Sequence, residues 1–260
     1  MPDHDPHPVR IVPMRPFRPE DVAEAHPPPA GRTLTYRNGP LLKAVDIYTL
    51  FWGAAWQGPQ ASLVTQINQF FQYIVTSPLI DQLAEYSVAG LPIGHGTFAG
   101  SLTITNSEPG ASISDSQIQA FLSTHPIAKT AFGKSKKHPP PQVSNRLVFL
   151  YLPIGTSVTM GGSASCTGFC GYHNHIGGQK FYAAMPFPSC SGCTGGLSTF
   201  NALTSTSSHE MCEAITDPIP GSGWYNDQYG EIGDICAWQT KILGAYTVQK
   251  EWSNAASGCL

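Results

Sequence analysis

Charged residues are scarce in this chain. They make up 12% of its 260 residues, about half of the usual share of roughly 25%. The net charge is −3, so the sequence lacks the basic excess that nucleic-acid and anionic-membrane binders carry. It also lacks any apolar run near the roughly 20 residues that span a bilayer. We therefore expect neither a nucleic acid nor a membrane among its partners, and the oligomeric state stays open.

The N-terminal segment lacks both a signal-peptide core and the means to fold alone. It begins MPDHDPHPVR, which contains no apolar stretch of the kind found in a classical signal peptide. Residues 1–40 hold ten of the 23 prolines and no lysine or cysteine. A segment of this composition buries too little apolar surface to fold by itself. We expect residues 1–40 to form a Pro-rich extended arm or a pro-segment, and residues 41–260 to form the folded domain.

Hydrophobic patterning over the rest of the chain alternates between strands and helices. Val45 to Phe51 is rich in β-branched and aromatic residues, and Arg146 to Leu152 is an almost unbroken apolar run, typical of a buried central strand. Apolar residues recur at helical spacing from Gln60 to Val75. Further elements expected are a strand over Phe98 to Thr105 and helices that begin at Ser77-Pro78 and at Ser114. This alternation predicts an α/β layered domain with a mixed sheet.

All the cysteines lie in the C-terminal part of the chain. Their positions are 166, 170, 190, 193, 212, 236 and 259. The first four form two close pairs, which could hold zinc as a tetrathiolate or form disulfides in an oxidising compartment. Low charge and Gly/Ser-rich surroundings favour disulfides, and therefore a secreted, extracellular protein. The odd number leaves one thiol outside any internal pair, and the connectivity stays open.

The segment SSHEMCEAITDP, residues 207–218, carries the strongest chemical signal. His209, Glu213 and Asp217 are spaced four apart, so they share one face of a helix, and Asp217-Pro218 ends that helix. Glu210 follows the histidine, as in the H-E-x-x-H helix of zinc metallopeptidases. A carboxylate is an acceptable zinc ligand, so His209 and Glu213 are predicted metal ligands in an H-E-x-x-E version of that site.

A third ligand is expected downstream, in WYNDQYGEIGDIC over residues 224–236. Glu231 and Asp234 both suit this role, and the sequence does not separate them. A disulfide at Cys236 would hold either of them in place. Calcium is the alternative ion, in a structural role, if the site is built mainly from carboxylates.

The segment CGYHNHI, residues 170–176, adds two histidines, one of which is expected to face the site. We choose His173 as the residue that helps to stabilise an oxyanion. Glu210 is the predicted general base, which takes a proton from a water held by the zinc and passes it to the leaving amine. These roles predict a secreted zinc-dependent metallopeptidase that acts on a peptide or protein substrate.

Three stretches together resemble a known family. DIYTLFWGAAW near the start, C-x3-C-G-Y-H in the middle, and PSCSGC followed by a helix ending T-D-P resemble the phosphate-induced/EXORDIUM-like proteins. The resemblance runs from about Leu41 to the C-terminus and is most specific over residues 166–236. It implies an extracellular, disulfide-bonded protein. Plant members generally lack the pair seen here at His209 and Glu210, so this chain resembles a microbial member with a zincin-like layout and an active-site helix.

Two other functions remain open from the sequence. A non-catalytic extracellular module of the EXORDIUM type would bind cell-wall glycan or protein. A polysaccharide-active enzyme would use paired carboxylates such as Glu210 and Glu213. The aromatic residues available to stack on sugar rings in the first case are Trp52, Trp56, Trp224, Tyr225 and Trp238.

Overall fold

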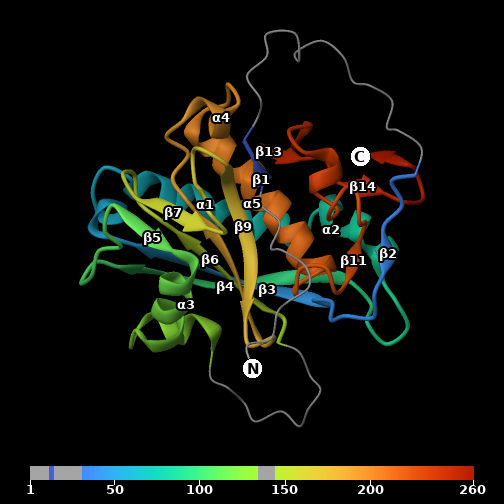
Figure 1. Cartoon of the computed structure of the whole chain (residues 1–260), viewed down its shortest axis with the longest axis horizontal. Helices are drawn as coiled ribbons and strands as arrows, with labels where there is room; N and C mark the ends of the chain where they lie inside the picture. The colour runs from blue at the N-terminus through green and yellow to red at the C-terminus, as the bar shows by residue number, and fades with distance from the viewer. Residues whose placement is uncertain (1–11, 15–30, 134–143) are drawn as a thin grey trace.

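The computed structural model describes residues 12–14, 31–133 and 144–260 (Figure 1). Its centre is a six-stranded mixed sheet with the strand order β1-β9-β10-β6-β3-β4. Four neighbouring strands, β10, β6, β3 and β4, run parallel, whereas β9 and β1 are antiparallel to their neighbours. The strands of this sheet are β1 (Val12–Pro13), β3 (Ala44–Trp52), β4 (Gly94–Ile104), β6 (Arg146–Tyr151), β9 (Phe169–Ile176) and β10 (Lys180–Met185).

Helices cover both faces of the sheet, and smaller strand pairs surround it (Figure 1). The helices are α1 (Ala61–Ile74), α2 (Pro78–Leu83), α3 (Asp115–Thr124), α4 (Ser191–Thr194) and α5 (Thr199–Thr216). The remaining strands are β2 (Thr35–Tyr36), β5 (Ser112–Ser114), β7 (Ser157–Met160), β8 (Ser163–Ala164), β11 (Trp224–Tyr225), β12 (Thr240–Leu243), β13 (Tyr246–Gln249), β14 (Trp252–Ser253) and β15 (Gly258–Cys259). The predicted α/β class with a mixed sheet is confirmed.

The central strands build one hydrophobic core on each face of the sheet. Successive side chains of a strand point to opposite faces. In β6, Leu147 and Phe149 therefore enter the core that packs against α1 and α5, whereas Val148 and Leu150 enter the core that packs against α3. This double burial explains why the β6 segment is an almost unbroken apolar run.

The predicted helix starts are confirmed by their caps. The Ser77 hydroxyl accepts a hydrogen bond from the N–H of Leu79, and Pro78 occupies the first position of α2. Ser114 and Gln117 form a reciprocal capping box at the start of α3. Both arrangements satisfy N–H groups that have no partner inside the helix.

α5 is the central helix of the molecule, and every residue from Ala202 to Thr216 in it is buried. It contacts β9 and β10 on one side and β13 on the other. Several of its hydroxyl groups bond within the helix or to neighbouring strands: Thr204 donates to the carbonyl of Thr247 in β13 at 2.7 Å, and Ser207 pairs with the Tyr151 hydroxyl in β6 at 2.7 Å. α5 can therefore carry polar side chains into the interior at little cost in lost hydrogen bonds.

Three disulfides connect the C-terminal part, which confirms the disulfide prediction. They join Cys166 to Cys190, Cys170 to Cys193, and Cys236 to Cys259. The tetrathiolate zinc site is wrong, because all four of its candidate sulfurs are in disulfides. Cys212 is the unpaired cysteine, and it is buried in α5.

The N-terminal segment lies partly outside the described residues. Within the part that the structure describes, β1 joins the edge of the sheet and β2 pairs with β11. Leu34 is buried in the larger core, so packing begins before the boundary expected at residue 41. No helix in the described ranges is both long enough and apolar enough to cross a membrane.

Candidate metal centre

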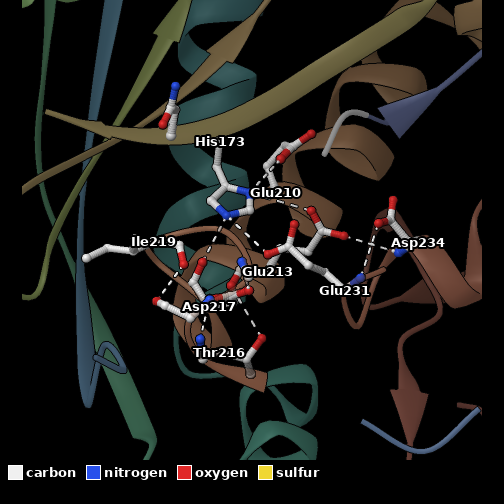
Figure 2. Close-up of polar contacts among 12 residues, drawn as sticks. His173, Glu210, Glu213, Thr216, Asp217, Ile219, Glu231 and Asp234 are labelled. Atoms are coloured by element: carbon white, nitrogen blue, oxygen red, sulfur yellow. Dashed lines mark hydrogen bonds and ion pairs between the residues drawn. The ribbon is translucent and has the colours of Figure 1, made fainter. Parts of the chain in front are cut away.

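The predicted site residues converge between α5, β9 and the loop after β11 (Figure 2). α5 supplies His209, Glu210 and Glu213, and β9 supplies His173 from the adjacent sheet edge. The loop that precedes the Cys236 disulfide supplies Glu231 and Asp234. All of these side chains are buried except that of Asp234, which is partly exposed.

His209, Glu213 and Asp234 form one group of potential metal ligands. One ligand atom from each lies within 4.8 Å of the other two. Nε2 of His209 lies 2.9 Å from Oε1 of Glu213, but neither ring nitrogen of His209 makes a directed hydrogen bond. The same Glu213 oxygen accepts the backbone N–H of Asp234 at 3.1 Å. Of the two candidates for the third ligand, the structure thus brings Asp234 to His209 and Glu213.

His173 forms a second group with Glu210 and Glu213. Its Nδ1 lies 3.2 Å from Oε2 of Glu210, and its Nε2 lies 3.1 Å from the carbonyl oxygen of Asp217. Burial alone would lower the pKa of His173, but Glu231, Glu210 and Glu213 together raise it well above its usual value. Each ring nitrogen of His173 therefore faces an oxygen atom that can accept a hydrogen bond, and its neighbours hold the ring in place.

Several carboxylate oxygens of the cluster have no hydrogen-bond partner. They are Oε1 of Glu210 and both oxygens of Glu231, although Glu231 lies 3.4 Å from Nε2 of His173. Burial raises the pKa of both carboxyl groups, in Glu231 well above its ordinary value. Burial would also raise the pKa of Glu213, but His209 and His173 lower it to about 2. Buried carboxylates without partners are unfavourable unless a proton or a cation neutralises them.

Asp217 organises the loop after α5 and does not join the ligand groups. Its carboxylate accepts the backbone N–H groups of Gly221, Ser222 and Gly223 at 2.6, 3.0 and 2.6 Å. Burial raises its pKa to about 6, although these N–H groups oppose the shift. Asp217 therefore fixes the end of the helix that carries the site.

His175 contacts the turn that follows β9. Its Nδ1 accepts the N–H of Gly178 at 3.0 Å, in the turn between β9 and β10. Residues two apart on a strand share a face, and His173 and His175 both lie in β9. The structure places only His173 of this pair against Glu210.

Glu251 is a buried acid of this region that the sequence reasoning missed. It is fully buried between β13 and β14, and neither of its carboxylate oxygens has a hydrogen-bond partner. Burial raises its pKa well above the usual value, and His209 opposes that shift, so the two side chains interact. Its setting in KEW, beside a lysine and a tryptophan, resembles an ordinary surface segment and gives no signal of this burial.

The donor set fits zinc better than calcium. Calcium takes six to eight oxygen ligands, whereas an imidazole nitrogen with two or three carboxylates suits zinc and related transition metals. His209 could supply that nitrogen, Glu213 and Asp234 could supply oxygens, and the cluster holds further carboxylate oxygens that have no hydrogen-bond partner.

The aromatic residues proposed as a glycan-stacking surface are mostly internal. Trp52, Trp56 and Tyr225 are buried. Trp224 packs against Tyr86, with ring centroids 5.2 Å apart. These rings therefore form part of the cores and do not make a shared exposed platform.

Comparisons with protein-family models, curated proteins and solved structures found no match to this chain. The resemblance to EXORDIUM-like proteins therefore stays a prediction, and the functional argument rests on the site itself.

Proposed function

We propose that this protein is a secreted zinc-dependent peptidase. The observation that carries the proposal is the buried cluster in which His209 contacts Glu213 without a directed hydrogen bond and several carboxylate oxygens have no hydrogen-bond partner. Such groups are rare in folded proteins and call for an explanation such as a bound ion. The three disulfides support an extracellular location, because disulfides persist in oxidising compartments.

His209, Glu213 and Asp234 would hold the zinc. When bound, zinc supplies Lewis acidity towards a peptide carbonyl and lowers the pKa of water that it contacts. Asp234 is partly exposed, so this side of the cluster faces the surface. Two carboxylate ligands place more negative charge on the metal than histidines would, and we expect slower hydrolysis than at a histidine-rich site.

Glu210 would act as the general base at its unpartnered Oε1. Burial raises the pKa of this carboxyl group, which brings it closer to the operating pH and favours both taking up and releasing a proton. His173 holds the other oxygen of Glu210 at 3.2 Å and is itself fixed by the Asp217 carbonyl. This geometry favours a positioning role of His173 towards Glu210 over the oxyanion role expected from the sequence.

The substitution Glu210→Gln tests the proposal. We expect it to lower kcat for peptide hydrolysis by a factor of at least about 100, because a general base contributes 10²–10⁴-fold, while the zinc content stays unchanged. The matched control is Glu108→Gln. Glu108 accepts the N–H of Ala54 at a distant exposed site, and glutamine keeps that acceptor. Full activity in zinc-loaded Glu210→Gln would rule out the assigned role.

A further inference from the structure

A segment from the N-terminal arm closes the edge of the central sheet. β1 pairs antiparallel with β9, with Val12 opposite Gly171 and Pro13 opposite Phe169. The register shifts between these two pairs, so the pairing is irregular. Without β1, β9 would be an edge strand, and the unpaired backbone groups of an edge strand can accept an extended peptide.

The side chains of this segment pack in a small apolar cluster beside β9. Val12 is 2% exposed and lies in a small apolar cluster with the disulfide-bonded Cys170. The indole N–H of Trp238 donates to the carbonyl oxygen of Pro13 at 2.9 Å. Trp238 has φ +67°, an uncommon backbone conformation for a residue other than glycine. One apolar cluster and one hydrogen bond to the Pro13 carbonyl thus hold β1 in addition to its pairing with β9.

Met14 extends the contact by one residue. Its N–H donates to the carbonyl oxygen of Gly168 at 3.4 Å. Its side chain packs on Gly192 of α4, where a Cβ would overlap it. The edge of β9 and the adjoining apolar cluster therefore accommodate three consecutive residues of an extended chain.

The β9 residues that pair with β1 adjoin the candidate metal centre through Gly171. A Cβ at Gly171 would lie 3.3 Å from Oε1 of Glu210, so no side chain separates the strand from that carboxylate. His173, two residues further along β9, contacts the other oxygen of Glu210. β1 also contacts α5 directly. The residue that pairs with Val12 is thus the one that lies against the proposed general base.

We propose that the edge of β9 is the peptide-binding site of this protein and that Val12–Met14 occupies it as an inhibitory strand. The inhibitory effect rests on the proposed peptidase function, whereas the docking of Val12–Met14 on β9 is a separate claim. The partner class is an extended peptide with a small aliphatic side chain at the Val12 position. A covalently attached segment competes at an effective concentration that reaches millimolar values for short flexible connections, so it would exclude weakly binding peptides in trans.

The test uses the full chain and a fluorescein-labelled peptide with the sequence of residues 8–18, PVRIVPMRPFR. Val12→Asp places an unpaired carboxylate in the apolar cluster beside Cys170, which disfavours docking of β1. We expect the peptide to bind this variant at least ten times more tightly than the wild type. Met14→Asp, which removes the side chain that packs on Gly192 from the covalent strand and leaves the labelled peptide unchanged, should shift the affinity in the same direction. Ile242→Asp is the matched control, because Ile242 is 71% exposed on β12.

The outcomes separate the docking from the peptidase function. Equal peptide affinity in the wild type and both release variants, with unchanged melting temperatures, would overturn the inference. Tighter binding without hydrolysis of the peptide by the zinc-loaded variants would support peptide binding at the edge of β9 and count against the peptidase function. Hydrolysis of a general protein substrate at the same rate in wild type and variants, with no gain in peptide binding, would leave the peptidase standing and refute the inhibitory strand.

Discussion

At the scale of single residues, the imidazole of His209 depends on the absence of a side chain at Gly233. A Cβ at Gly233 would lie 2.7 Å from Nδ1 of His209, closer than real contacts allow. Gly233 has φ −79°, a conformation open to any residue, so this glycine is required for space and not for backbone freedom. The backbone of Gly233 therefore contacts the histidine ring at Nδ1, and Glu213 contacts it at Nε2.

Gly233→Ala should displace His209 and weaken zinc binding. We expect a loss of about 10- to 100-fold in zinc affinity, the range seen when groups that orient a ligand are changed, and about 1–3 kcal/mol in stability from overpacking. Zinc titration against a competing chelator measures the first effect, and thermal unfolding measures the second.

Gly94→Ala is the control for this substitution. A Cβ at Gly94 would meet no atom within 4 Å, so the methyl group should be accommodated without effect on zinc affinity. If Gly233→Ala binds zinc as tightly as Gly94→Ala does, then His209 is not held as a ligand at this place.

At the scale of elements, the loop that carries Asp234 is held by a covalent bond as well as by hydrogen bonds. Cys236 follows Asp234 by two residues and is joined to Cys259 near the C-terminus. The N–H of Asp234 donates to Glu213, and Gln249 donates from its side chain to the Gly233 carbonyl at 2.9 Å. The disulfide thus fixes one ligand of the proposed site relative to α5.

Two disulfide knockouts with similar loop lengths separate stability from site geometry. The bonds 236–259 and 166–190 close loops with sequence separations of 23 and 24 residues. Removing either by paired Cys→Ser substitution should cost about 3 kcal/mol, because the loops are of nearly equal size. Zinc affinity should fall further in Cys236→Ser/Cys259→Ser, since only that bond adjoins Asp234. Equal losses of zinc affinity in the two double variants would contradict this account.

Local patterns made the central elements predictable. A segment rich in β-branched and aromatic residues identified β3, an unbroken apolar run identified β6, and the serine caps identified the starts of α2 and α3. Each of these signals depends on neighbours a few residues away. β1 gave no such signal, because a two-residue strand exists only where the edge of β9 receives it.

At the scale of the whole molecule, the site could be predicted only in part. The H-E-x-x-E spacing placed His209, Glu210 and Glu213 on one helix because the helical repeat is local. The choice between Glu231 and Asp234 depends on how a distant loop meets α5, which spacing does not encode. The same limit applies to the burial of Glu251, whose position follows from the packing of the C-terminal strands.

The arrangement of the whole chain concentrates acidic groups inside a protein that carries few charges. Glu210, Glu213, Glu231 and Glu251 are each at most 1% exposed, and His173 and His209 are the histidines buried with them. Burial makes these acids costly to ionise, and a divalent cation would stabilise their charged forms. The central claim of this account is therefore a metal ion held at His209.

Zinc content of the purified full chain, measured by inductively coupled plasma mass spectrometry after zinc loading and desalting, tests that claim most directly. We expect about one zinc per chain in the wild type, since structural donors of this kind bind zinc tightly, and loss of it in His209→Gln. His95→Gln is the control, because His95 is exposed and pairs with Asp81 at 2.8 Å, away from the cluster; it should keep its zinc. A wild type without zinc, or His209→Gln with as much zinc as the control, would contradict the proposed site.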